Sequence, residues 1–442
     1  MHAEPQKTQA LKLPAAMPVR TLSVEITEGS DRGARWEGDQ GTFGTAADTA
    51  LGLKDETVSG YHMRLTAADG GVRVSDLGST NGSFVGDVRI EHGTVPPGSM
   101  LRLGRTMMLI GAGAAAVVEL HDEDRLGELR GQTQTMRRLM TQVRRAAQSN
   151  VAVLLIGESG TGKELLARAV HDASPRAQAP FVTVDCGAIT PSLVASELFG
   201  HEKGSFTGAT HTKIGAFERA NTGTLFLDEV GELPPELQSN LLGALERRRF
   251  CRVGGQKEVS VDLRVVAATN RDLRANVNAG RFRLDLYYRL AVVTLDVPPL
   301  RERAKDIPLL VAHFAAEEDF DGPLSALISD ATMTELLAYR WPGNVRELRN
   351  YVQATVAMGH TPLPGLDAPE PSGSELEDLR SGFASLDDLP YGEARTALLH
   401  EFEVHYLAQR LKRSGGNVTQ AARDAGMARS HLNEIIRRHG IR

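Results

Sequence analysis

Apolar and polar positions alternate with different periods in different parts of the chain. Between Val19 and Ile110, short apolar or β-branched runs are separated by turn residues such as Asn81 and Gly82, which predicts an all-β sandwich over residues 19–118. Over residues 125–360, buried-strand patterns alternate with helical ones, which predicts a parallel α/β sheet. The 442 residues are enough for about three domains, so we expect a multidomain chain.

The two ends of the chain have patterns of their own. Residues 1–18 have no apolar core that would serve as a signal peptide, and we expect a disordered N-terminus. Residues 361–390 are rich in Pro, Gly, Ser and acidic residues, a composition that buries little apolar surface and predicts a linker. A helical pattern then resumes and predicts an all-α domain over residues 391–442.

Composition narrows the classes of function. The longest uncharged apolar run, residues 107–118, is shorter than the ~20 residues that span a bilayer. The formal net charge of −6 gives no global sign of nucleic-acid binding, and two cysteines are too few for a disulfide framework. We therefore expect a cytoplasmic protein without a membrane partner, in which Cys186 and Cys251 are small, buried apolar side chains.

A phosphate-binding loop is predicted where the apolar strand of residues 151–156 meets a glycine-rich segment and then a helical pattern. Glycines let backbone N–H groups turn inward, the helix offers its positive end, and a lysine reaches terminal phosphates. The alternative interpretation is an ordinary Gly-rich turn. The residues expected to bind nucleotide here are Gly157, Glu158, Ser159, Gly160, Thr161, Gly162, Lys163 and Glu164. Glu164 departs from the general pattern, which has Ser or Thr at this position.

Acidic and amide side chains follow the next two buried strands. Residues 223–227 form an apolar run that ends in Asp228 and Glu229, and beside a phosphate loop we assign Asp228 to Mg²⁺ and Glu229 to the attacking water. The alternative is a helix cap or a solvated loop. Residues 264–268 form a further strand that ends at Thr269 and Asn270, and we expect Asn270 to sense the γ-phosphate.

These motifs together resemble the AAA+ domain of sigma-54-dependent transcriptional activators, the bacterial enhancer-binding proteins, over residues 125–360, with a helical lid at the end. The most specific element is the segment 197–209, in which two glycines flank an aromatic residue and a threonine. The resemblance implies that Phe206 and Thr207 contact sigma-54. As a bare pattern, the same segment would be an ordinary flexible loop. Glu164 is the form that the phosphate loop takes in this family.

The same resemblance implies roles for several further residues. Arg283 and Arg289 would act in trans on the nucleotide of a neighbouring subunit, which makes hydrolysis depend on a ring of six or seven subunits. The alternative for each arginine is a surface salt bridge. Arg346 would sense nucleotide from the lid. Asp185 stands where many members carry an asparagine that restrains the catalytic glutamate, and two carboxylates facing each other would repel or share a proton.

The N-terminal sandwich resembles the forkhead-associated (FHA) domain, which binds phosphothreonine peptides. By this resemblance Ser59 contacts phosphate, His62 is structural and Asn81 holds the peptide backbone. The cations that usually accompany the phosphate are replaced by Thr45 and Gly60, which removes charge-assisted hydrogen bonds. Two interpretations stay open, a phosphothreonine site and an FHA fold that contacts proteins without phosphate.

A helix-turn-helix is predicted over residues 417–438, where two short helical patterns flank a turn at Gly426. It resembles the Fis-type DNA-binding module that ends most members of the activator family. The alternative is a three-helix oligomerisation bundle with a basic face. The side chains placed to reach base edges or phosphates of double-stranded DNA are Arg429, Ser430, His431, Asn433, Arg437 and Arg438.

Taken together, the sequence predicts an ATP-driven transcriptional activator that uses ATP and Mg²⁺, binds an upstream activating sequence, assembles into a ring and remodels the sigma-54 RNA polymerase closed complex. The FHA-like sandwich would supply a sensory or protein-interaction input, with a phosphothreonine protein as a partner. Two alternatives are an FHA-type adaptor or DNA-bound repressor with a weak ATPase, and a general AAA+ protein remodeller.

Overall fold

The computed structural model describes residues 16–68, 70–187, 191–206, 208–359 and 418. The chain divides into two compact units, Met1–Thr361 and Pro362–Arg442. The predicted β-sandwich and α/β sheet both belong to the first unit. Residues 1–15 of the predicted disordered N-terminus, the linker and the six DNA-contacting residues of the helix-turn-helix lie outside the described residues. The prediction of disorder is wrong for residues 16–18, which pair in a β-strand that begins at Ala16.

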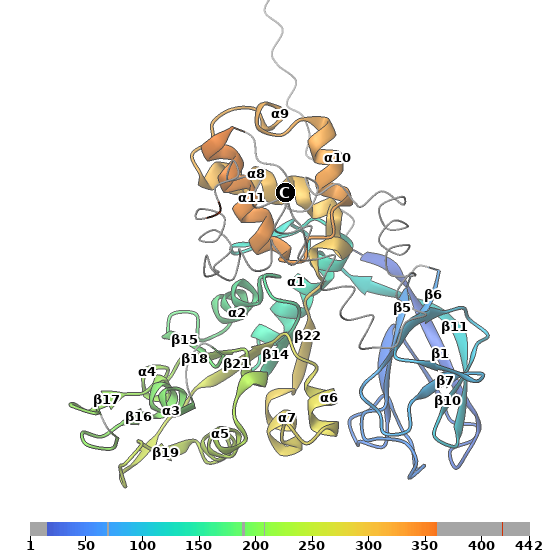
Figure 1. Ribbon diagram of the computed structural model, residues 1–442, viewed down its shortest axis with the longest axis horizontal. Helices are drawn as coiled ribbons and strands as arrows, with labels where there is room; N and C mark the ends of the chain where they lie inside the picture. Colours follow the sequence, from blue (N-terminus) through green and yellow to red (C-terminus); the bar gives the residue numbers. More distant parts are fainter. Residues whose placement is uncertain (1–15, 69, 188–190, 207, 360–417, 419–442) are drawn as a thin grey trace, which may run out of the picture. The chain divides into compact units, whose positions relative to one another are not determined.

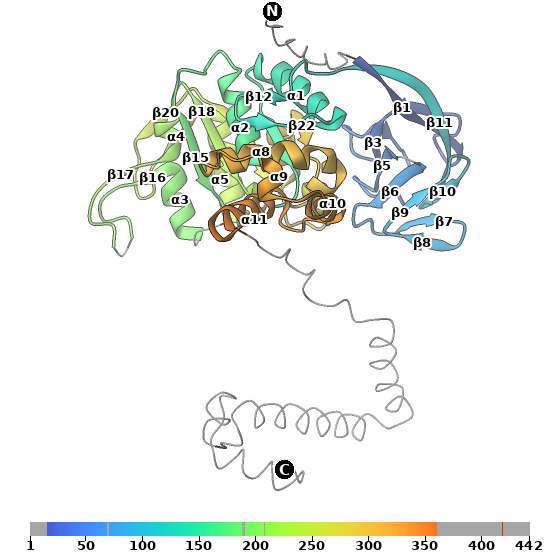
Figure 2. The ribbon, with the colours of Figure 1, turned by 90° about the horizontal axis from the view of Figure 1, so that it is seen from above.

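Residues 16–119 form a sandwich of two sheets, as the alternating pattern predicts (Figure 2). The first sheet has the order β2 (Arg35–Gly38), β1 (Ala16–Glu28), β11 (Thr106–Glu119), β10 (Met100–Leu103), β7 (Ser83–Val85) and β8 (Val88–Ile90). The second has the order β4 (Leu51–Gly52), β3 (Gln40–Gly44), β5 (Met63–Ala68), β6 (Gly71–Asp76) and β9 (His92–Val95). The long strands β1 and β11 pair antiparallel, from Ala16 with Glu119 to Glu28 with Met107.

The core of the sandwich follows from the period of two along its strands. On β1, Leu22, Val24 and Ile26 are each 1% exposed, while the residues between them face outward. They pack against Met63 and Leu65 of β5, which are fully buried. The two sheets therefore share one apolar layer between them.

The second domain is built on a five-stranded parallel sheet, which confirms the predicted α/β fold (Figure 1). Its order is β15 (Phe181–Asp185), β18 (Thr224–Asp228), β21 (Arg264–Thr269), β14 (Val153–Ile156) and β22 (Val293–Asp296). Strands β14, β18 and β21 are apolar along most of their length because helices cover both faces of a parallel sheet. The carboxyl ends of these strands lie at one edge.

The remaining elements cover the sheet, form short ribbons or build the lid, and Figure 2 shows α8 to α11 grouped together. The helices are α1 (Gln134–Ala147), α2 (Lys163–Asp172), α3 (Pro191–Phe199), α4 (Ala216–Arg219), α5 (Pro235–Arg247), α6 (Leu273–Asn278), α7 (Leu284–Leu290), α8 (Ile307–Glu317), α9 (Leu324–Leu327), α10 (Asp330–Ala338) and α11 (Asn344–Met358), with the 3₁₀ helices η1 (Val230–Glu232) and η2 (Leu300–Asp306). The two-stranded ribbons are β12 (Arg125–Leu126) with β13 (Leu129–Arg130), β16 (Gly200–His201) with β17 (Lys213–Ile214), and β19 (Arg249–Cys251) with β20 (Glu258–Ser260).

Helix α1 shows how the sequence fixes an element locally. The side chain of Thr133 caps its first turn by accepting a hydrogen bond from the backbone N–H of Met136, at 3.4 Å. Leu139, Val143 and Ala146 are buried on one face, as their spacing predicts.

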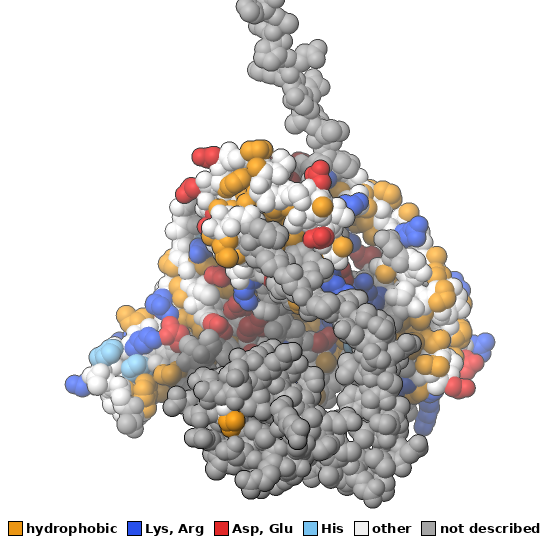
Figure 3. All heavy atoms as spheres, turned by 45° about the horizontal axis from the view of Figure 1, so that its top comes forward, with side chains coloured by type: hydrophobic (Ala, Val, Ile, Leu, Met, Phe, Trp, Pro, Cys, Tyr) orange, Lys and Arg blue, Asp and Glu red, His pale blue; other side chains and the backbone are white. Residues whose placement is uncertain are grey.

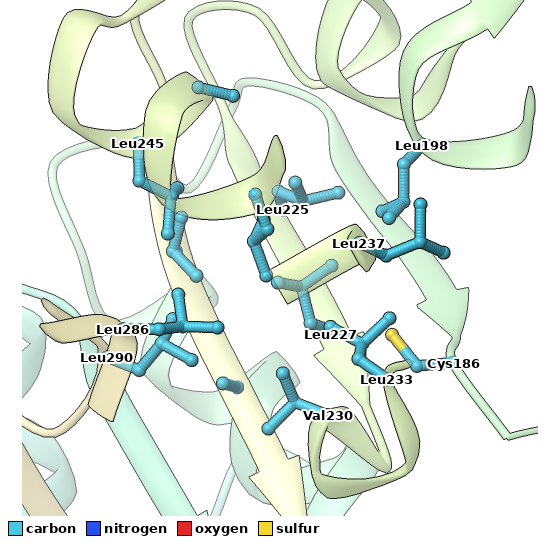
Figure 4. Packing of buried hydrophobic residues seen from close by; sticks show 14 of the residues in the cluster. Cys186, Leu198, Leu225, Leu227, Val230, Leu233, Leu237, Leu245, Leu286 and Leu290 are labelled. Atoms are coloured by element: carbon cyan, nitrogen blue, oxygen red, sulfur yellow. The ribbon is translucent and has the colours of Figure 1, made fainter. Parts of the chain in front are cut away.

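One face of the parallel sheet carries the largest apolar core (Figure 4). The side chains labelled there include Leu225 and Leu227 of β18, Leu237 and Leu245 of α5, and Leu286 and Leu290 of α7. Burying each leucine contributes about 1.5–3 kcal/mol. This packing holds the carboxyl end of β18 in place beneath the phosphate loop.

The two cysteines have different environments. Cys186 is buried in this core, and burial raises the pKa of its thiol to about 12, so the side chain stays protonated. The prediction that Cys251 is also buried is wrong. Cys251 ends the edge strand β19, in which only the middle residue, Phe250, faces the core.

Candidate functional site

The phosphate loop joins β14 to α2 and depends on glycines at two points. Gly160 and Gly162 have φ values of 76° and 100°, in the left-handed region that favours glycine. A Cβ atom on Gly160 would also lie 2.3 Å from the carbonyl oxygen of Gly343, which directly precedes α11 of the lid. The loop therefore has the backbone that the sequence predicts for binding phosphate, and the lid packs directly on it.

Lys163 begins α2 and is 6% exposed. Its ammonium group donates hydrogen bonds to the carbonyl oxygens of Gly157 and Glu158, at 3.0 and 3.3 Å, and to Oε1 of Glu229, at 3.3 Å. The structure thus brings together the predicted lysine and the predicted catalytic carboxylate. Thr161 is buried and its hydroxyl donates to the carbonyl oxygen of Glu158, which occupies it within the loop.

Asp228 and Glu229 lie where β18 ends. Glu229 has a left-handed backbone, with φ 47°, and its N–H donates to Oδ1 of Asp228 at 3.0 Å. The backbone N–H of Asn270 donates to Oε2 of Glu229, also at 3.0 Å. The sequence singled out the Asn270 side chain, whereas its backbone is the group that orients the glutamate in this structure.

The electrostatics at this strand end suit a cation. Burial raises the pKa of Asp228, and the carboxylates of Glu229 and Asp185 add to that rise, while Lys163 acts in the opposite direction. Asp185 ends the neighbouring strand, in register with Asp228, and its Oδ1 accepts the N–H of Gly187 at 2.8 Å.

Among the described residues, no group of three or more His, Cys, Asp or Glu side chains forms a metal cage. A single half-buried carboxylate beside a phosphate loop matches the way Mg²⁺ is held in nucleotide sites, by one or two carboxylates, phosphate oxygens and water. The donor set around Asp228 therefore fits Mg²⁺ bound together with a nucleotide.

The lid reaches the phosphate loop through the first turn of α11. The guanidinium group of Arg346 donates to the hydroxyl of Ser159 at 3.1 Å. The backbone N–H groups of Val345 and Arg346 donate to the carbonyl oxygen of Gly160, at 2.9 and 3.3 Å. The predicted lid arginine thus lies at the phosphate loop.

A second set of lid residues, which no sequence motif marks, also contacts the phosphate loop. Arg301 makes a bidentate pair with Glu158, at 2.8 and 2.6 Å, which lowers the pKa of that carboxyl group. Asn344 donates to Oε2 of Glu158 at 3.1 Å and to the carbonyl oxygen of Ser159 at 3.0 Å. Because these partners are separated by well over a hundred residues, no local pattern could have paired them.

Arg303 is a further lid residue at this loop, and no sequence motif marks it. It is 3% exposed, and its guanidinium group donates to the carbonyl oxygen of Thr161 at 2.8 Å. Burial lowers its pKa to about 10, so it still carries charge at neutral pH. The lid therefore holds the outer side of the phosphate loop through two arginines, Arg301 and Arg303.

Arg283 and Arg289 lie at the two ends of α7, and their described contacts run to α5 and within α7. Arg283 pairs with Asp285 at 3.0 and 2.7 Å, and its side chain is 48% exposed. Arg289 donates to the carbonyl oxygen of Leu245 at 2.9 Å. Neither arginine has a described contact with Lys163 of the same chain.

The segment between β16 and β17 carries the predicted sigma-54 contact. Phe206 is 38% exposed, and its ring packs edge-on against His201 with centroids 4.9 Å apart. Gly204 and Gly208 flank it with φ values of 84° and 100°. Thr207 lies outside the described residues. In Figure 3, histidine side chains lie beside Lys and Arg side chains at the end of the domain that carries this segment.

Three loops at one end of the sandwich, residues 45–50, 53–62 and 77–82, carry the predicted peptide contacts, and we call them the recognition edge. The hydroxyl of Ser59 accepts the N–H of Thr80 at 3.0 Å. The backbone N–H of Ser59 donates to Nδ1 of His62 at 3.1 Å, and burial lowers the pKa of that ring. The side-chain amide of Asn81 donates to the carbonyl oxygen of Thr57 at 2.7 Å. Ser59 and Asn81 therefore brace the loops themselves.

None of the described helices is both long enough and apolar enough to cross a lipid bilayer.

Three segments of the chain match known protein families. Residues 129–296 match the sigma-54 interaction domain, and residues 301–368 match the AAA+ ATPase lid domain. Residues 25–113 match a family described as the cytoplasmic domain of an inner membrane component of T3SS. The family match on the sandwich is thus not one for FHA domains, and the FHA assignment stays a prediction.

Similar proteins of known name are transcriptional regulators. The regulatory protein ZraR of Escherichia coli K12 is 44% identical over 306 residues, which cover 68% of this chain and 66% of ZraR. The DNA-binding regulator NtrC of Azospirillum brasilense is 40% identical over 345 residues, 73% of this chain and 72% of NtrC. The match to ZraR thus spans slightly less than two thirds of that protein.

A solved structure shows the same relationship. NtrX from Brucella abortus, crystallised in complex with ATP, is 37% identical and covers 72% of this chain and 71% of its own, with a TM-score of 0.51. Nucleotide in a relative of this identity agrees with the arrangement of Lys163, Asp228, Glu229 and Arg346. On these grounds the chain belongs to the family of transcriptional regulators built around an AAA+ sigma-54 interaction domain.

Proposed function

We propose that this protein is an ATP-driven transcriptional activator, which binds upstream DNA, assembles into a ring and uses ATP hydrolysis to remodel the sigma-54 RNA polymerase closed complex so that the promoter opens. The observation that carries this proposal is the convergence of Lys163, Glu229 and Arg346 on one phosphate loop beside Asp228. An intact hydrolytic site distinguishes an activator from a protein that only occupies DNA.

The residues of the site divide the chemistry of hydrolysis among them. Asp228 would hold Mg²⁺, which supplies positive charge to the phosphate oxygens when it is bound. Lys163 and Arg346 would bind terminal phosphates. Glu229 would orient the attacking water and accept its proton. In the structure Lys163 pairs with Glu229, so a phosphate group that draws Lys163 away leaves Oε1 of Glu229 free for water.

Ring assembly would supply the remaining charge. Arg283 and Arg289 lie on α7 without a contact to their own phosphate loop, which suits cations that act on the nucleotide of a neighbour in a hexamer or heptamer. A cation near the transferred phosphoryl group stabilises the charge that develops there. Hydrolysis would then rise with assembly.

The other functions are assigned to segments at the periphery. Phe206 and Thr207 would contact sigma-54, because an exposed aromatic residue between two glycines forms an adaptable apolar tip. The recognition edge of the FHA-like sandwich would receive a protein input, including a phosphothreonine protein. The C-terminal residues that would bind DNA are Arg429, Ser430, His431, Asn433, Arg437 and Arg438.

Promoter opening by purified protein with sigma-54 polymerase tests the activity as a whole. We expect opening that requires hydrolysable ATP and that Thr207→Ala abolishes while hydrolysis persists. Thr212→Ala, in the same segment and outside the proposed contact, is the matched control. Opening that survives Thr207→Ala would overturn the assigned contact, and a wild-type protein that binds DNA without hydrolysing ATP would favour the adaptor or repressor.

The trans role of the arginines has a separate test. Arg283→Ala should lower turnover at protein concentrations where rings form, and mixing it with an Asp228→Asn chain should restore part of that turnover, because each chain supplies what the other lacks. Arg249→Ala is the control, since Arg249 makes only an exposed pair with Glu258. Equal turnover of Arg283→Ala and wild type would remove Arg283 from the site.

A further inference from the structure

Two apolar residues of the recognition edge belong to the core of the ATPase domain. Tyr61 and Leu77 are 1% and 4% exposed, and they pack in the cluster that contains Leu286 and Tyr287 of α7 rather than in the core of the sandwich. The rings of Tyr61 and Tyr287 meet edge-on with centroids 5.6 Å apart. The ATPase domain of the same chain therefore covers the recognition edge at Tyr61 and Leu77, whereas Thr80 and Asn81 stay exposed.

A single side chain of α6 binds the backbone of this edge. Nδ2 of Asn278 donates to the carbonyl oxygens of Tyr61 and Leu77, at 2.5 and 3.0 Å. Oδ1 of Asn278 accepts the N–H of Tyr61 at 3.4 Å. One carboxamide thus satisfies both the backbone donor and the backbone acceptor of one residue, Tyr61, as the backbone of a bound peptide would.

Polar contacts surround the buried tyrosine. The Tyr61 hydroxyl donates to Asp48 at 2.8 Å, and the hydroxyl of Tyr288 on α7 donates to the same carboxylate oxygen at 3.3 Å. The guanidinium group of Arg274 on α6 lies 5.4 Å from the ring of Tyr61 and donates to the hydroxyl of Thr42 at 2.8 Å. The contact therefore combines a buried aromatic anchor with a polar rim, which is typical of a specific protein interface.

Gly60 relates the Asn278 contact to the cationic side chain that the FHA resemblance expects and this chain lacks. It lies between Ser59 and Tyr61, where the FHA resemblance expects a cation. A Cβ atom on Gly60 would have Oδ1 of Asn278 as its one neighbour within 4 Å, at 3.8 Å. A long side chain at this position would reach toward Asn278, so α6 and a cation-bearing edge compete for the same space.

We propose that the resident ligand of the recognition edge is the α6–α7 segment of the same chain, and that a phosphothreonine peptide competes with it for that edge. Bound in this way, the sandwich holds Tyr287 and Tyr288 on the helix that carries Arg283 and Arg289. Peptide binding then frees α7 for the neighbouring subunit and raises turnover. The regulatory part of this inference rests on the proposed function, whereas the contact itself does not.

Two variants of the 442-residue chain open the contact by different routes. Asn278→Ala removes three hydrogen bonds at the end of α6 and leaves the phosphate loop untouched. Gly60→Arg places a long side chain against Asn278 and needs no positive φ, so its backbone is unstrained. Gln40→Ala is the matched control, because it removes one exposed hydrogen bond between the sandwich and Asp296, away from the recognition edge.

Amide hydrogen exchange reads the contact directly, without nucleotide. Losing these partly buried hydrogen bonds should shift the docking equilibrium about tenfold or more toward the open state. We expect faster exchange over residues 57–64 and 272–290 in Asn278→Ala and in Gly60→Arg, with thermal midpoints near that of wild type, and no change in Gln40→Ala. Unchanged exchange in both variants would overturn the contact.

The rate of ATP turnover tests whether the contact regulates hydrolysis. Both variants should hydrolyse ATP faster than wild type and Gln40→Ala, about threefold or more at the same protein concentration. Faster exchange with unchanged turnover would overturn the regulatory part and keep the contact. If no chain hydrolyses ATP, the proposed function fails, and the exchange result still decides the contact.

A degenerate phosphothreonine peptide library tests the competitor. Asn278→Ala should bind the library about tenfold more tightly than wild type, because less of the edge is already occupied. The unphosphorylated library is run in parallel. Equal affinity of Asn278→Ala and wild type for the phosphorylated library would overturn competition, and equal affinity of Asn278→Ala for the two libraries would overturn the phosphate dependence of the competitor.

Discussion

The phosphate loop of the ATPase domain and the recognition edge of the sandwich are two loop systems that the sequence associates with phosphate, and they differ in what surrounds their polar groups. Lys163, Arg301, Arg303 and Arg346 all contact the phosphate loop. The recognition edge has Gly60 where the sequence resemblance expects a cation, and its serine already accepts a backbone N–H. The phosphate loop is therefore surrounded by cationic side chains, whereas polar groups of the recognition edge bind one another.

This difference shows that loop shape alone does not make a phosphate site. Anion affinity comes from charge-assisted hydrogen bonds, which are roughly twice as strong as neutral ones. The phosphate loop has both the backbone and the cations. The recognition edge has the loops, and in this structure it binds the carboxamide of Asn278 instead. We therefore expect ATP hydrolysis to depend strongly on the phosphate loop. Peptide binding at the recognition edge should depend only weakly on phosphate.

The largest effect is expected from Lys163→Ala. It removes the cation that lies between the phosphate loop and Glu229, and hydrolysis should fall about 10²–10³-fold, as for other groups that stabilise charge in a transition state. Steady-state phosphate release measures it, with Lys54→Ala on the sandwich as a control. If Lys163→Ala keeps wild-type turnover, the loop is not the site of hydrolysis.

Asp228→Asn should lower hydrolysis about 10²-fold, whereas Thr161→Val should lower it less than tenfold, because the Thr161 hydroxyl is bound within the loop. Phosphate release with varied Mg²⁺ measures both. The reverse order would show that the metal ligand is misassigned.

The raised pKa of Asp228 adds a second expectation for the nucleotide-free protein. A carboxyl group whose pKa is higher in the folded than in the unfolded state binds more protons when folded, so it lowers stability as pH rises through that pKa. Asp228→Asn should therefore raise the thermal midpoint at pH 7, and the gain should disappear toward pH 4. A lower midpoint at pH 7 would contradict the burial argument.

Arg301→Ala should have a smaller effect. It leaves Glu158 with its hydrogen bond from Asn344. Arg301 and Glu158 are both more than a third exposed, so solvent weakens their ion pair. We therefore expect the binding free energy of nucleotide to fall by about 1 kcal/mol, or roughly fivefold in affinity. The pair contributes stability above the unfolded pKa of about 4.5 and loses it as pH falls through the lowered pKa of Glu158. Fluorescent ADP titration measures the affinity, and Arg249→Ala should bind like wild type.

The smallest effect is expected from Ser59→Ala. Because the Ser59 hydroxyl already accepts the N–H of Thr80 and no cation stands at position 60, phosphopeptide affinity should fall less than threefold. Calorimetry with the phosphothreonine library in the Asn278→Ala background measures it. A loss of tenfold or more would show that the recognition edge is a phosphate site like the phosphate loop.

Local sequence was sufficient for much of the ATPase domain. The apolar strand, the glycines and Lys163 occur within a dozen residues, so their pattern predicts a strand, a turn and a helix that the structure confirms. Asp228 and Glu229 follow from the same logic at the end of β18. Cys251 shows the limit, because an edge strand buries only alternate residues and the local pattern does not say which face is outward.

The phosphate loop therefore had its backbone and its lysine determined by the sequence, because the motif is contiguous and its glycine conformations are local. Only the tertiary structure decided what surrounds it, namely Arg301, Arg303 and Asn344 of the lid, and the backbone N–H of Asn270 on Glu229. It also decided that Asn278 binds the backbone of the recognition edge at Tyr61 and Leu77. These contacts join residues 41 to 217 positions apart, and long-range packing, rather than local periodicity, brings them together.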